Sequence, residues 1–461
     1  MYKRLHIHFI GIGGIGMSGI AEVLLNLGYP VSGSDMKRSA VTSRLKELGA
    51  QIHIGHREKN IEGADVVVYS SAINKGNEEL VAAHKAKIPV IRRAEMLAEL
   101  MRLTKYGIAV AGTHGKTTTT SLLASVLHAG GLDPTMVIGG KLNSLNTNAK
   151  LGRGDFMVVE ADESDGSFLH LLPTVAIVTN MDPDHMENFG HFDKYREAFE
   201  KFCEKIPFYG LAVLCGEHAE TLALAKKLDK RVLVYGFSKK HDYNAQNLKF
   251  AHTHSYFDLY RGEEFLDHIE LSLAGRHNVL NALATIVVAL DLGVGLKKIK
   301  EALKNFQGVG RRMEILFKGS NIIAIDDYGH HPAEISATIS AVRGAFAGRL
   351  VVLFQPHRYT RTQLLYKEFL ECFDLADALF LTKIYSAGEA PIAGVSAKVM
   401  HADLAKRLKE CHYVTSVEEA PKALMNFIKP GDIFLTLGAG DVTHAGRIVA
   451  EELKEKYGSV T

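Results

Sequence analysis

The stretch that decides the fold is GIAVAGTHGKTTTT, residues 107–120. Its apolar run reaches a glycine-framed turn at 112–115, after which Lys116 and four threonines begin a helix-like segment. A strand, a tight turn and a helix in that order direct backbone N–H groups and the positive end of the helix dipole at an anion. Lys116 adds a positive charge, and the hydroxyl of Thr117 can reach a magnesium ion on a nucleotide. The stretch therefore predicts a site for a nucleoside triphosphate.

The general phosphate-loop pattern is only partly met, because Val110 stands where the standard spacing has a glycine. The chemistry of the last four residues of the pattern is nevertheless intact. A helix start that merely happens to carry Gly-Lys-Thr is the alternative. The strand–turn–helix context favours the phosphate loop over that alternative.

Composition describes a soluble globular protein of about three domains, since 461 residues are too many for one core. Lys and Arg number 54 against 52 Asp and Glu, so the net charge of +2 favours neither nucleic acid nor an anionic membrane as a partner. The amino terminus enters a strand without a signal-peptide core, and no apolar run is long enough to span a bilayer. We expect a cytoplasmic protein, with reduced thiols at Cys203, Cys215, Cys372 and Cys411.

Strand and helix patterns restart twice along the chain and predict three α/β domains, at 1–105, 106–309 and 310–461. In the first, a Rossmann-like domain, strands are expected at 5–10, 65–69 and 89–91, and helices at 17–27, 40–48, 77–87 and 94–103. In the second, an ATPase-like domain, strands are expected at 155–160 and 174–179, helices near 193–205 and 277–291, and added β structure within 211–274. In the third, again Rossmann-like, strands are expected at 321–325, 349–354, 378–382 and 432–437, and helices at 332–343, 396–408 and 441–456.

A second glycine-rich turn, GIGGIG at 11–16, directly follows the first predicted strand. Asp35 ends the next strand, near the distance expected for an acid that holds a ribose hydroxyl. Taken alone, this pattern indicates an NAD-dependent dehydrogenase, but no convincing hydride-transfer acid accompanies it. The same geometry serves any pyrophosphate, including that of a nucleotide sugar, and a tightly packed glycine turn is the structural alternative. The loop predicts a diphosphate site without saying which diphosphate.

Oxygen-bearing side chains in the middle of the chain suit a metal ion beside a triphosphate. Glu160 ends an apolar strand and begins EADESDGSF, where an acid favours magnesium that bridges phosphates. His185 follows in the polar turn MDPDHMEN and is equally open to a structural role. Asn278 and Asn281 lie about one turn apart at a predicted helix start, where they would contact an adenine edge or cap the helix.

The third domain gathers basic and aromatic residues after two predicted strands, beyond the junction Gly310-Arg311-Arg312. Bidentate arginines in such a group would hold the carboxylate of an amino acid, and the carboxyl ends of strands are where α/β ligands bind. A surface charge cluster is the alternative that this placement disfavours. The residues of this predicted second-substrate site are Asp327, Tyr328, His330, His331, His357, Arg358 and Arg361.

Eight motifs occur in one order along the chain: GIGGIGMSGIAE, AGTHGKTTT, EADESDGSF, DHMEN, GRHNVLNA, GRRME, DDYGHHP and PHRYTRT. Together they resemble the Mur ligases from the first strand to the last domain. The resemblance implies a UDP-sugar domain, a central ATPase domain and a carboxy-terminal domain that brings the amino acid. It implies ATP and magnesium, for which manganese could substitute, and a role in peptidoglycan synthesis, and so in cell shape, the cell cycle and cell division. DDYGHHP and PHRYTR favour the member that adds L-alanine to UDP-N-acetylmuramate.

The resemblance also implies roles for single residues. It places ATP at Gly112, Thr113, His114, Gly115, Lys116, Thr117, Thr118, Asn278, Asn281, Arg312 and Asp327. It places the UDP-sugar at Gly11, Gly13, Gly14, Gly16, Asp35, Ser71 and Arg93. It places metal ions at Thr117, Glu160 and His185, and the amino acid at Tyr328, His330, His357, Arg358 and Arg361. It gives catalytic roles to Lys116, Glu160, His185, Arg312 and His330, with His330 as the base that deprotonates the incoming amine.

Three competing functions remain open at this point. A recycling ligase that joins UDP-N-acetylmuramate to a ready-made murein peptide shares the first two predicted sites. A dehydrogenase explains 11–16 and Asp35 but leaves Lys116, Glu160 and Arg312 without a role. A non-catalytic ATP-binding switch protein explains the phosphate loop but not the arginines and histidines of the third domain.

Overall fold

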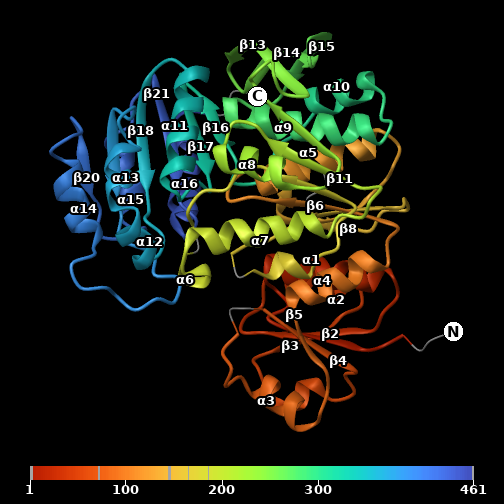
Figure 1. Cartoon of the computed structure of the whole chain (residues 1–461). Coiled ribbons are helices and arrows are strands. Elements are labelled where there is room, and N and C mark those ends of the chain that lie inside the picture. Colours follow the sequence, from red (N-terminus) through yellow and green to blue (C-terminus); the bar gives the residue numbers. More distant parts are fainter. Residues whose placement is uncertain (1–3, 71–72, 144–146, 165, 185, 459–461) are drawn as a thin grey trace. The chain divides into compact units, whose positions relative to one another are not determined.

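The computed structural model describes residues 4–70, 73–143, 147–164, 166–184 and 186–458. They form three β-sheets with helices packed on them (Figure 1). By the density of its contacts the chain divides into two compact units. The first unit comprises 1–246, 258–269 and 280–307, and the second comprises 247–257, 270–279 and 308–461.

The first sheet has five parallel strands in the order β3-β2-β1-β4-β5. Its strands are β1 (Ile7–Ile10), β2 (Val31–Asp35), β3 (Gln51–Ile54), β4 (Val66–Tyr69) and β5 (Val90–Arg92). Helices α1 (Ile15–Asn26), α2 (Ala40–Glu47) and α4 (Arg93–Arg102) lie on one face, and α3 (Glu78–Lys85) lies beyond the other (Figure 1). A 3-10 turn, η1 (Glu58–Ile61), packs beside α3. Both faces of β1 are covered, as its four buried residues require.

The second sheet has ten strands in the order β15-β14-β13-β12-β11-β10-β6-β9-β7-β8. Its strands are β6 (Tyr106–Ala111), β7 (Thr135–Leu142), β8 (Thr147–Lys150), β9 (Phe156–Glu160), β10 (Val175–Val178), β11 (Leu211–Cys215), β12 (Val232–Gly236), β13 (Tyr243–Ala251), β14 (His254–Arg261) and β15 (Glu264–Leu271). The helical elements are α5 (Lys116–Ala129), η2 (Ser167–His170), α6 (Met186–Phe189), α7 (Phe192–Glu204), α8 (Ala219–Lys227), α9 (Arg276–Asp291) and α10 (Leu296–Lys304). Strand β6 is central and leads directly into α5, so the phosphate loop begins at the carboxyl end of a buried strand.

The third sheet has six strands in the order β16-β17-β21-β18-β19-β20, all parallel to their neighbours except β16. Its strands are β16 (Glu314–Gly319), β17 (Ile322–Asp327), β18 (Arg349–Phe354), β19 (Ala378–Leu381), β20 (Cys411–Tyr413) and β21 (Asp432–Leu437). The helices are α11 (Pro332–Ala345), α12 (Tyr359–Leu364), α13 (Tyr366–Glu371), α14 (Ala397–Leu404), α15 (Ala420–Met425) and α16 (Val442–Tyr457). Two apolar clusters, one on each face, hold this sheet between its helices. Strands β17 and β18 end at the two motifs that the sequence singles out.

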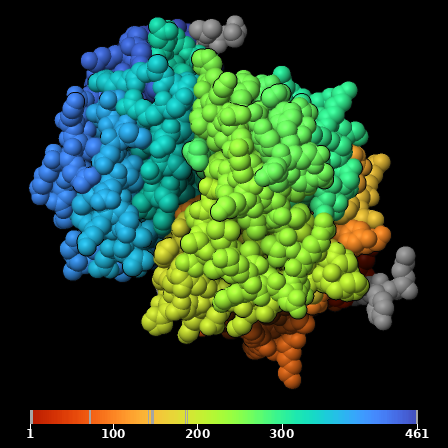
Figure 2. Space-filling view, turned by 45° about the horizontal axis from the view of Figure 1, so that its top comes forward, coloured from red at the N-terminus to blue at the C-terminus, as the bar shows by residue number. Residues whose placement is uncertain are grey.

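The expected helix at 396–408 is wrong at its end, because α14 stops at Leu404 and the chain then turns. None of the described helices combines the length and apolar character that crossing a bilayer requires. All four cysteines are free, and three of them are buried. Figure 2 draws the same chain in space-filling form, with the middle of the sequence in yellow to green.

Candidate active site

The loop between β6 and α5 is built around two glycines with positive φ. Gly112 has φ +131° and Gly115 has φ +82°, a region that residues with a side chain rarely adopt. A Cβ at Gly115 would lie 2.6 Å from Oδ1 of Asn281, and a Cβ at Gly112 would collide with Oγ1 of Thr179. Neighbouring strands and helices therefore press directly against the loop, and only glycine fits at both turns.

Lys116 folds back over this loop. Its Nζ donates to the carbonyl oxygens of Gly112 (2.6 Å) and Thr113 (3.0 Å) and to Oε1 of Glu163 (2.8 Å). Burial acts to lower the pKa of Lys116, but the carboxylates of Glu163 and Glu160 outweigh it and raise the pKa above its ordinary value. The residue therefore carries a fixed positive charge at the start of α5, where anion binding is already favoured.

Polar groups from neighbouring elements fix the rest of the loop. The backbone N–H of His114 donates to Oδ1 of Asn180 (2.8 Å), and the hydroxyl of Thr113 lies 3.0 Å from that of Tyr195. Tyr195 is fully buried in α7. Since Asn180 ends the TVAIVTN run after β10, two parallel strands supply the loop and its support.

Thr117 and Glu160 come together as the sequence predicts, although their metal-binding role stays a prediction. The hydroxyl of Thr117 donates to Oε1 of Glu160 (3.1 Å), while Oε2 accepts from the backbone N–H of Gly139 (2.9 Å). One hydroxyl and one carboxylate are oxygen donors of the kind that magnesium prefers, so these residues fit the ion. His185, the third predicted ligand, lies outside the described residues, which hold no group of three or more His, Cys, Asp or Glu side chains able to bind a metal.

The glycine loop after β1 is anchored by the acid predicted for it. Oδ2 of Asp35 accepts from the backbone N–H of Gly13 (2.9 Å), and Gly11 has φ +79°. A Cβ at Gly16 would lie 2.9 Å from Nη1 of Arg93, so the arginine reaches the loop where it enters α1. Gly14 is the residue that precedes this helix. Ser71, also predicted for this site, lies outside the described residues.

A cavity of about 320 Å³ joins the glycine loop to the acids of the second sheet. Arg93 bridges them, because its Nη2 donates to Oδ2 of Asp162 at 3.0 Å. The cavity is lined by Gly14, Ile15, Gly16, Met17, Ser70, Arg93, Leu97, Val137, Ile138, Gly139, Glu160 and Asp162. Two predicted sites, one for a diphosphate and one for a phosphate-bound metal, therefore share one cavity.

In the second unit, the residues predicted to bind the substrate amino acid also lie close together. The ring of His330 lies 5.3 Å from that of Tyr328 and 5.6 Å from that of His357. Nη1 of Arg361 lies 3.3 Å from Nδ1 of His357, and the Arg361 side chain is buried. Arg358 precedes α12 with φ +69°, an unusual conformation for a side chain of this size.

Burial and positive neighbours lower the pKa values of both histidines. Burial lowers the pKa of His330 to about 3, with Glu334 acting against it and Arg361 and His357 acting with it. Burial and then Arg361 and Arg358 lower the pKa of His357 to about 4. Both imidazoles are therefore neutral at pH 7, and the positive charge of the group belongs to its arginines.

Asp327 and Arg312, predicted to act on ATP, occupy the same end of β17. Oδ2 of Asp327 accepts from the backbone N–H of Met313 (2.8 Å), and Oδ1 accepts from that of Gly329 (2.8 Å). The guanidinium of Arg312 lies over the ring of Tyr328, 5.0 Å from its centre. Burial raises the pKa of Asp327, with Arg312 acting against it. Asp327 thus holds the turn that carries Tyr328 and Gly329.

The two predicted asparagines of α9 make different contacts. Oδ1 of Asn281 accepts from the hydroxyl of Thr119 (3.1 Å) and lies against Gly115, so this residue supports the phosphate loop. Nδ2 of Asn278 donates to the carbonyl oxygen of Ala274 (2.8 Å). That bond joins the side chain to the backbone just before α9 and is not a capping bond, because a cap accepts from a backbone N–H. Contact of Asn278 with adenine stays a prediction.

Several residues that shape the site carry no prediction from sequence, above all Glu163, Asp162 and Asn180. Glu163 and Asp162 lie inside the quoted motif EADESDGSF, and the position of that motif after a strand was the available signal. In the second unit, Glu334 and Tyr385 are likewise unpredicted. Nδ1 of His330 lies 3.5 Å from Oε2 of Glu334, and the ring of Tyr385 stacks on His357 at 5.5 Å.

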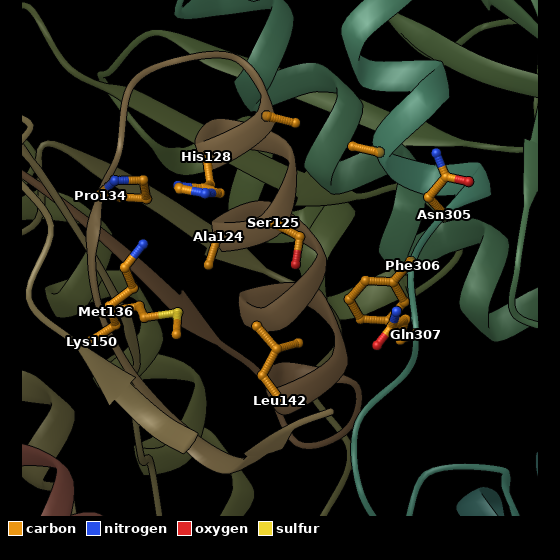
Figure 3. Close-up of a pocket in the computed structure, with 12 residues that line it drawn as sticks. Ala124, Ser125, His128, Pro134, Met136, Leu142, Lys150, Asn305, Phe306 and Gln307 are labelled. Carbon is orange, nitrogen blue, oxygen red and sulfur yellow. The ribbon is translucent and has the colours of Figure 1, made fainter. Parts of the chain in front are cut away.

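A second cavity, of about 240 Å³, lies between α5, the strands β7 and β8, and the end of α10. Figure 3 shows Ala124, Ser125 and His128 on α5, with Phe306 beside them. The remaining lining residues are Ala129, Pro134, Met136, Leu142, Lys150, Ala302, Asn305 and Gln307. None of the residues predicted for catalysis or for the substrates lines this cavity, so the candidate active site does not include it.

Family models match the chain in three consecutive parts. The Mur ligase family catalytic domain matches residues 6–105, the Mur ligase middle domain 110–289, and the Mur ligase glutamate ligase domain 311–440. The chain therefore belongs to the Mur ligase family, as its ordered motifs predict.

Individual relatives narrow the comparison. A UDP-N-acetylmuramate–L-alanine ligase of Geotalea daltonii is 52% identical over 458 residues, which cover 99% of this chain and 100% of the relative. The enzyme of that name from Myxococcus xanthus is 51% identical, over 98% of this chain and 97% of the relative. Among solved structures, the UDP-N-acetylmuramate–alanine ligase of Thermotoga maritima has a TM-score of 0.85 and 33% identity, covering 98% of this chain and all of that one. A murein peptide ligase of Psychrobacter arcticus, with a TM-score of 0.72 and 24% identity over 99% of each chain, shares the fold.

Proposed function

We propose that this chain joins L-alanine to the lactyl carboxylate of UDP-N-acetylmuramate and converts ATP to ADP and phosphate. The observation that carries the proposal is the cavity in which the glycine loop, Arg93 and Glu160 meet. An anionic nucleotide sugar held by the glycine loop would there lie beside the residues predicted to hold the triphosphate. Relatives that match this chain over nearly its whole length bear the name of this reaction.

In the first step, an oxygen of the lactyl carboxylate attacks the γ-phosphorus of ATP, and the bond from phosphorus to the β,γ-bridging oxygen breaks. The products are an acyl phosphate and ADP. Lys116 and the backbone N–H groups of the first turn of α5 are proposed to neutralise charge on the transferring phosphate, which is the main task of a protein in phosphoryl transfer. The N–H groups of Thr113 and His114 instead donate to Asn180. Arg312 is proposed to add positive charge to the transferring phosphate.

In the second step, the amine of L-alanine attacks the acyl carbon, and the tetrahedral intermediate expels inorganic phosphate. The attacking amine must first lose a proton, and His330 is the proposed acceptor. With a pKa of about 3, its imidazole is neutral and has a free lone pair at pH 7, although it is a weak base. Arg358 and Arg361 are proposed to hold the carboxylate of alanine.

A divalent cation would be held by Thr117 and Glu160 and, in a second position, by His185. When bound, magnesium would offset the negative charge of the phosphates. The hydroxyl of Thr117 and the carboxylate of Glu160 are already oriented toward one another, 3.1 Å apart. ATP follows from family membership, whereas magnesium and the identity of its ligands belong to the proposal.

The recycling ligase is the second candidate. A relative of that activity, the UDP-N-acetylmuramate:L-alanyl-γ-D-glutamyl-meso-diaminopimelate ligase of Neisseria meningitidis, is 31% identical over 67% of this chain, with a TM-score of 0.62. The two candidates differ in the amine that is accepted. The 51–52% identity to several alanine ligases favours alanine.

The test is phosphate release from ATP by the purified chain with UDP-N-acetylmuramate present. Parallel tubes contain no amine, L-alanine, or the murein tripeptide. Release that needs both the sugar and alanine is the expected result. Release with the tripeptide but not with alanine would assign the recycling reaction instead, and no release in any tube would overturn both.

A further inference from the structure

A buried carboxylate in the first domain has no part in the proposed mechanism. Glu79, near the start of α3, has no solvent exposure. Burial acts to raise its pKa, but hydrogen bonds from His8, Ser34 and Asn60 outweigh burial and lower the pKa to about 2. The side chain is therefore ionised and accepts hydrogen bonds with both oxygens at any physiological pH.

Its two oxygens face different groups. Oε1 accepts from Nδ2 of Asn60 (2.5 Å) and from the backbone N–H of Arg57 (3.2 Å). Oε2 accepts from the hydroxyl of Ser34 (2.6 Å) and faces Nε2 of His8 at 3.3 Å. One oxygen thus holds the segment after β3, and the other holds the serine near the end of β2.

The hydroxyl of Ser34 links Glu79 to His56 through two hydrogen bonds. Nδ1 of His56 lies 2.8 Å from Oγ of Ser34. Because Ser34 has one proton and donates it to Glu79, its oxygen must accept from Nδ1 of His56. The neutral imidazole then carries its proton on Nδ1 and a lone pair on Nε2. Among the described residues, none makes a hydrogen bond to this Nε2, and the His56 side chain keeps 14% of its surface exposed.

The position of His56 suits contact with a nucleotide base. The backbone N–H of Gly55 donates to the carbonyl oxygen of Asp35 (2.8 Å), and the Asp35 side chain accepts from Gly13 (2.9 Å). His56 therefore belongs to the same carboxyl edge as the loop predicted to hold the diphosphate. In nucleotide-binding sheets of this order, the acid after the second strand lies at the ribose. The base would then extend past Asp35 toward the end of β3.

We propose that Glu79 is a positioning residue that acts through Ser34 to make Nε2 of His56 a hydrogen-bond acceptor for the base, and so selects uracil over cytosine. This inference rests on the proposed function, in which the substrate carries UDP. Uracil has an N3–H donor, which an acceptor satisfies. Cytosine has a lone pair on N3, which would face the lone pair of Nε2 without a proton between them.

The sharpest test is Glu79→Gln, because the geometry determines which way the new amide points. Asn60 Nδ2 and the Arg57 N–H both donate to Oε1, so the amide oxygen must take that place and the NH₂ must face Ser34. Ser34 then accepts from glutamine and donates its own proton to Nδ1 of His56. The imidazole proton moves to Nε2, which becomes a donor and suits cytosine.

The measurement is the Kd of UDP and of CDP for the full chain by calorimetric titration. We expect the unsubstituted chain to bind UDP at least about 10-fold more tightly than CDP, and Glu79→Gln to remove or reverse that preference. Ser34→Ala removes the hydroxyl that links Glu79 to His56 and leaves only the direct approach of Glu79 Oε2 to His56 Nδ1 at 3.7 Å. It should reduce the preference to within about 3-fold without reversing it. The matched control is Glu78→Gln, the exposed neighbour on α3, which should keep the original ratio.

An unchanged ratio in both Glu79→Gln and Ser34→Ala would overturn the inference, even where ligase activity is normal. If Glu79→Gln does not fold, the Ser34→Ala ratio alone decides the matter. A chain that binds no UDP at all and releases no phosphate would instead overturn the proposed function, and the inference with it.

Discussion

Lys116 is the residue on which the ATP assignment depends most directly. Replacing it with alanine removes the charge at the start of α5 and leaves Glu163 buried beside an empty position. We expect ATP turnover with both co-substrates to fall at least about 1,000-fold, since electrostatic stabilisation of the transferring phosphate is lost. Phosphate release measures this. Lys105→Ala, at an exposed lysine just before β6, is the control and should keep its activity. Near-normal turnover in Lys116→Ala would remove the phosphate loop from the mechanism.

The same residue shows what a sequence can and cannot predict. The pattern around Lys116 predicts its charge and its place after a turn, because strand, glycine and helix signals are local. Its partner Glu163 lies 47 positions away in sequence, and only the pairing of β6 with β9 brings the two together. Likewise, the motifs predict the histidines of the second unit, but not their lowered pKa values, which depend on burial.

Arg361 gives a second prediction at the scale of one residue. The side chain is buried, and its Nη1 lies 3.3 Å from His357. Arg361→Lys keeps a positive charge but loses the planar fork that binds a carboxylate through two hydrogen bonds. We expect the KM for alanine to rise about 10-fold or more, with the KM for ATP within about 2-fold of the original. Initial rates at varied alanine measure this, and Arg407→Lys, at an exposed arginine, is the control. An unchanged alanine KM would exclude Arg361 from the amino-acid site.

At the scale of elements, the turn between β6 and α5 differs from an ordinary glycine turn by what packs against it. Gly115 and Gly131 both have positive φ, +82° and +87°, and they flank the two ends of α5. A Cβ at Gly115 would press on Asn281, whereas a Cβ at Gly131 would meet nothing within 4 Å. We expect Gly131→Ala to lose about 1 kcal/mol of stability and no activity. Gly115→Ala should lose more stability than Gly131→Ala, because its Cβ would also press on Asn281, and it should lose most of its affinity for ATP.

Nucleotide titration together with the midpoint of thermal unfolding separates the two glycine variants. Equal ATP affinity in both would show that the contact with Asn281 does not shape the nucleotide site. A loss of ATP affinity in Gly131→Ala would equally count against the interpretation, because that glycine lies at the far end of the helix.

Elements with a strong local pattern were predictable, and those defined by pairing were not. Strands such as β1, β9 and β18 are mostly apolar, and their predicted positions lie within two residues of those observed. The pair β7 and β8 had no prediction, because TMVIGGKL carries two glycines and its strand character comes from pairing with β9. That omission matters for the site, since Gly139 of β7 holds Glu160. The three-domain α/β fold and family membership followed from the motifs and are confirmed.

At the scale of the whole molecule, two histidines of the second unit and a buried glutamate of the first should respond to acid in different pH ranges. In the second unit, His330 and His357 have pKa values of about 3 and about 4, lower than the 6.5 of an ordinary histidine. As the pH falls, these histidines take up protons in the unfolded chain before they do so in the folded chain. Their contribution to the free energy of unfolding is therefore fully present above pH 6.5 and decreases as the pH falls toward 4. In the first unit, Glu79 has a pKa of about 2 instead of 4.5. Its contribution to the free energy of unfolding is therefore fully present above pH 4.5 and is lost only below that pH.

The midpoint of thermal unfolding between pH 8 and pH 5 therefore responds to His330 and His357, whereas the Glu79 carboxylate stays ionised throughout that range. Each histidine contributes at most about 1.4 kcal/mol per pH unit, which corresponds to a decrease of several degrees by pH 5. His357→Phe keeps the ring that stacks on Tyr385 but cannot take up a proton, so its midpoint should change less over this range. A midpoint independent of pH, or a slope unaffected by His357→Phe, would mean that these histidines are not held neutral by the fold.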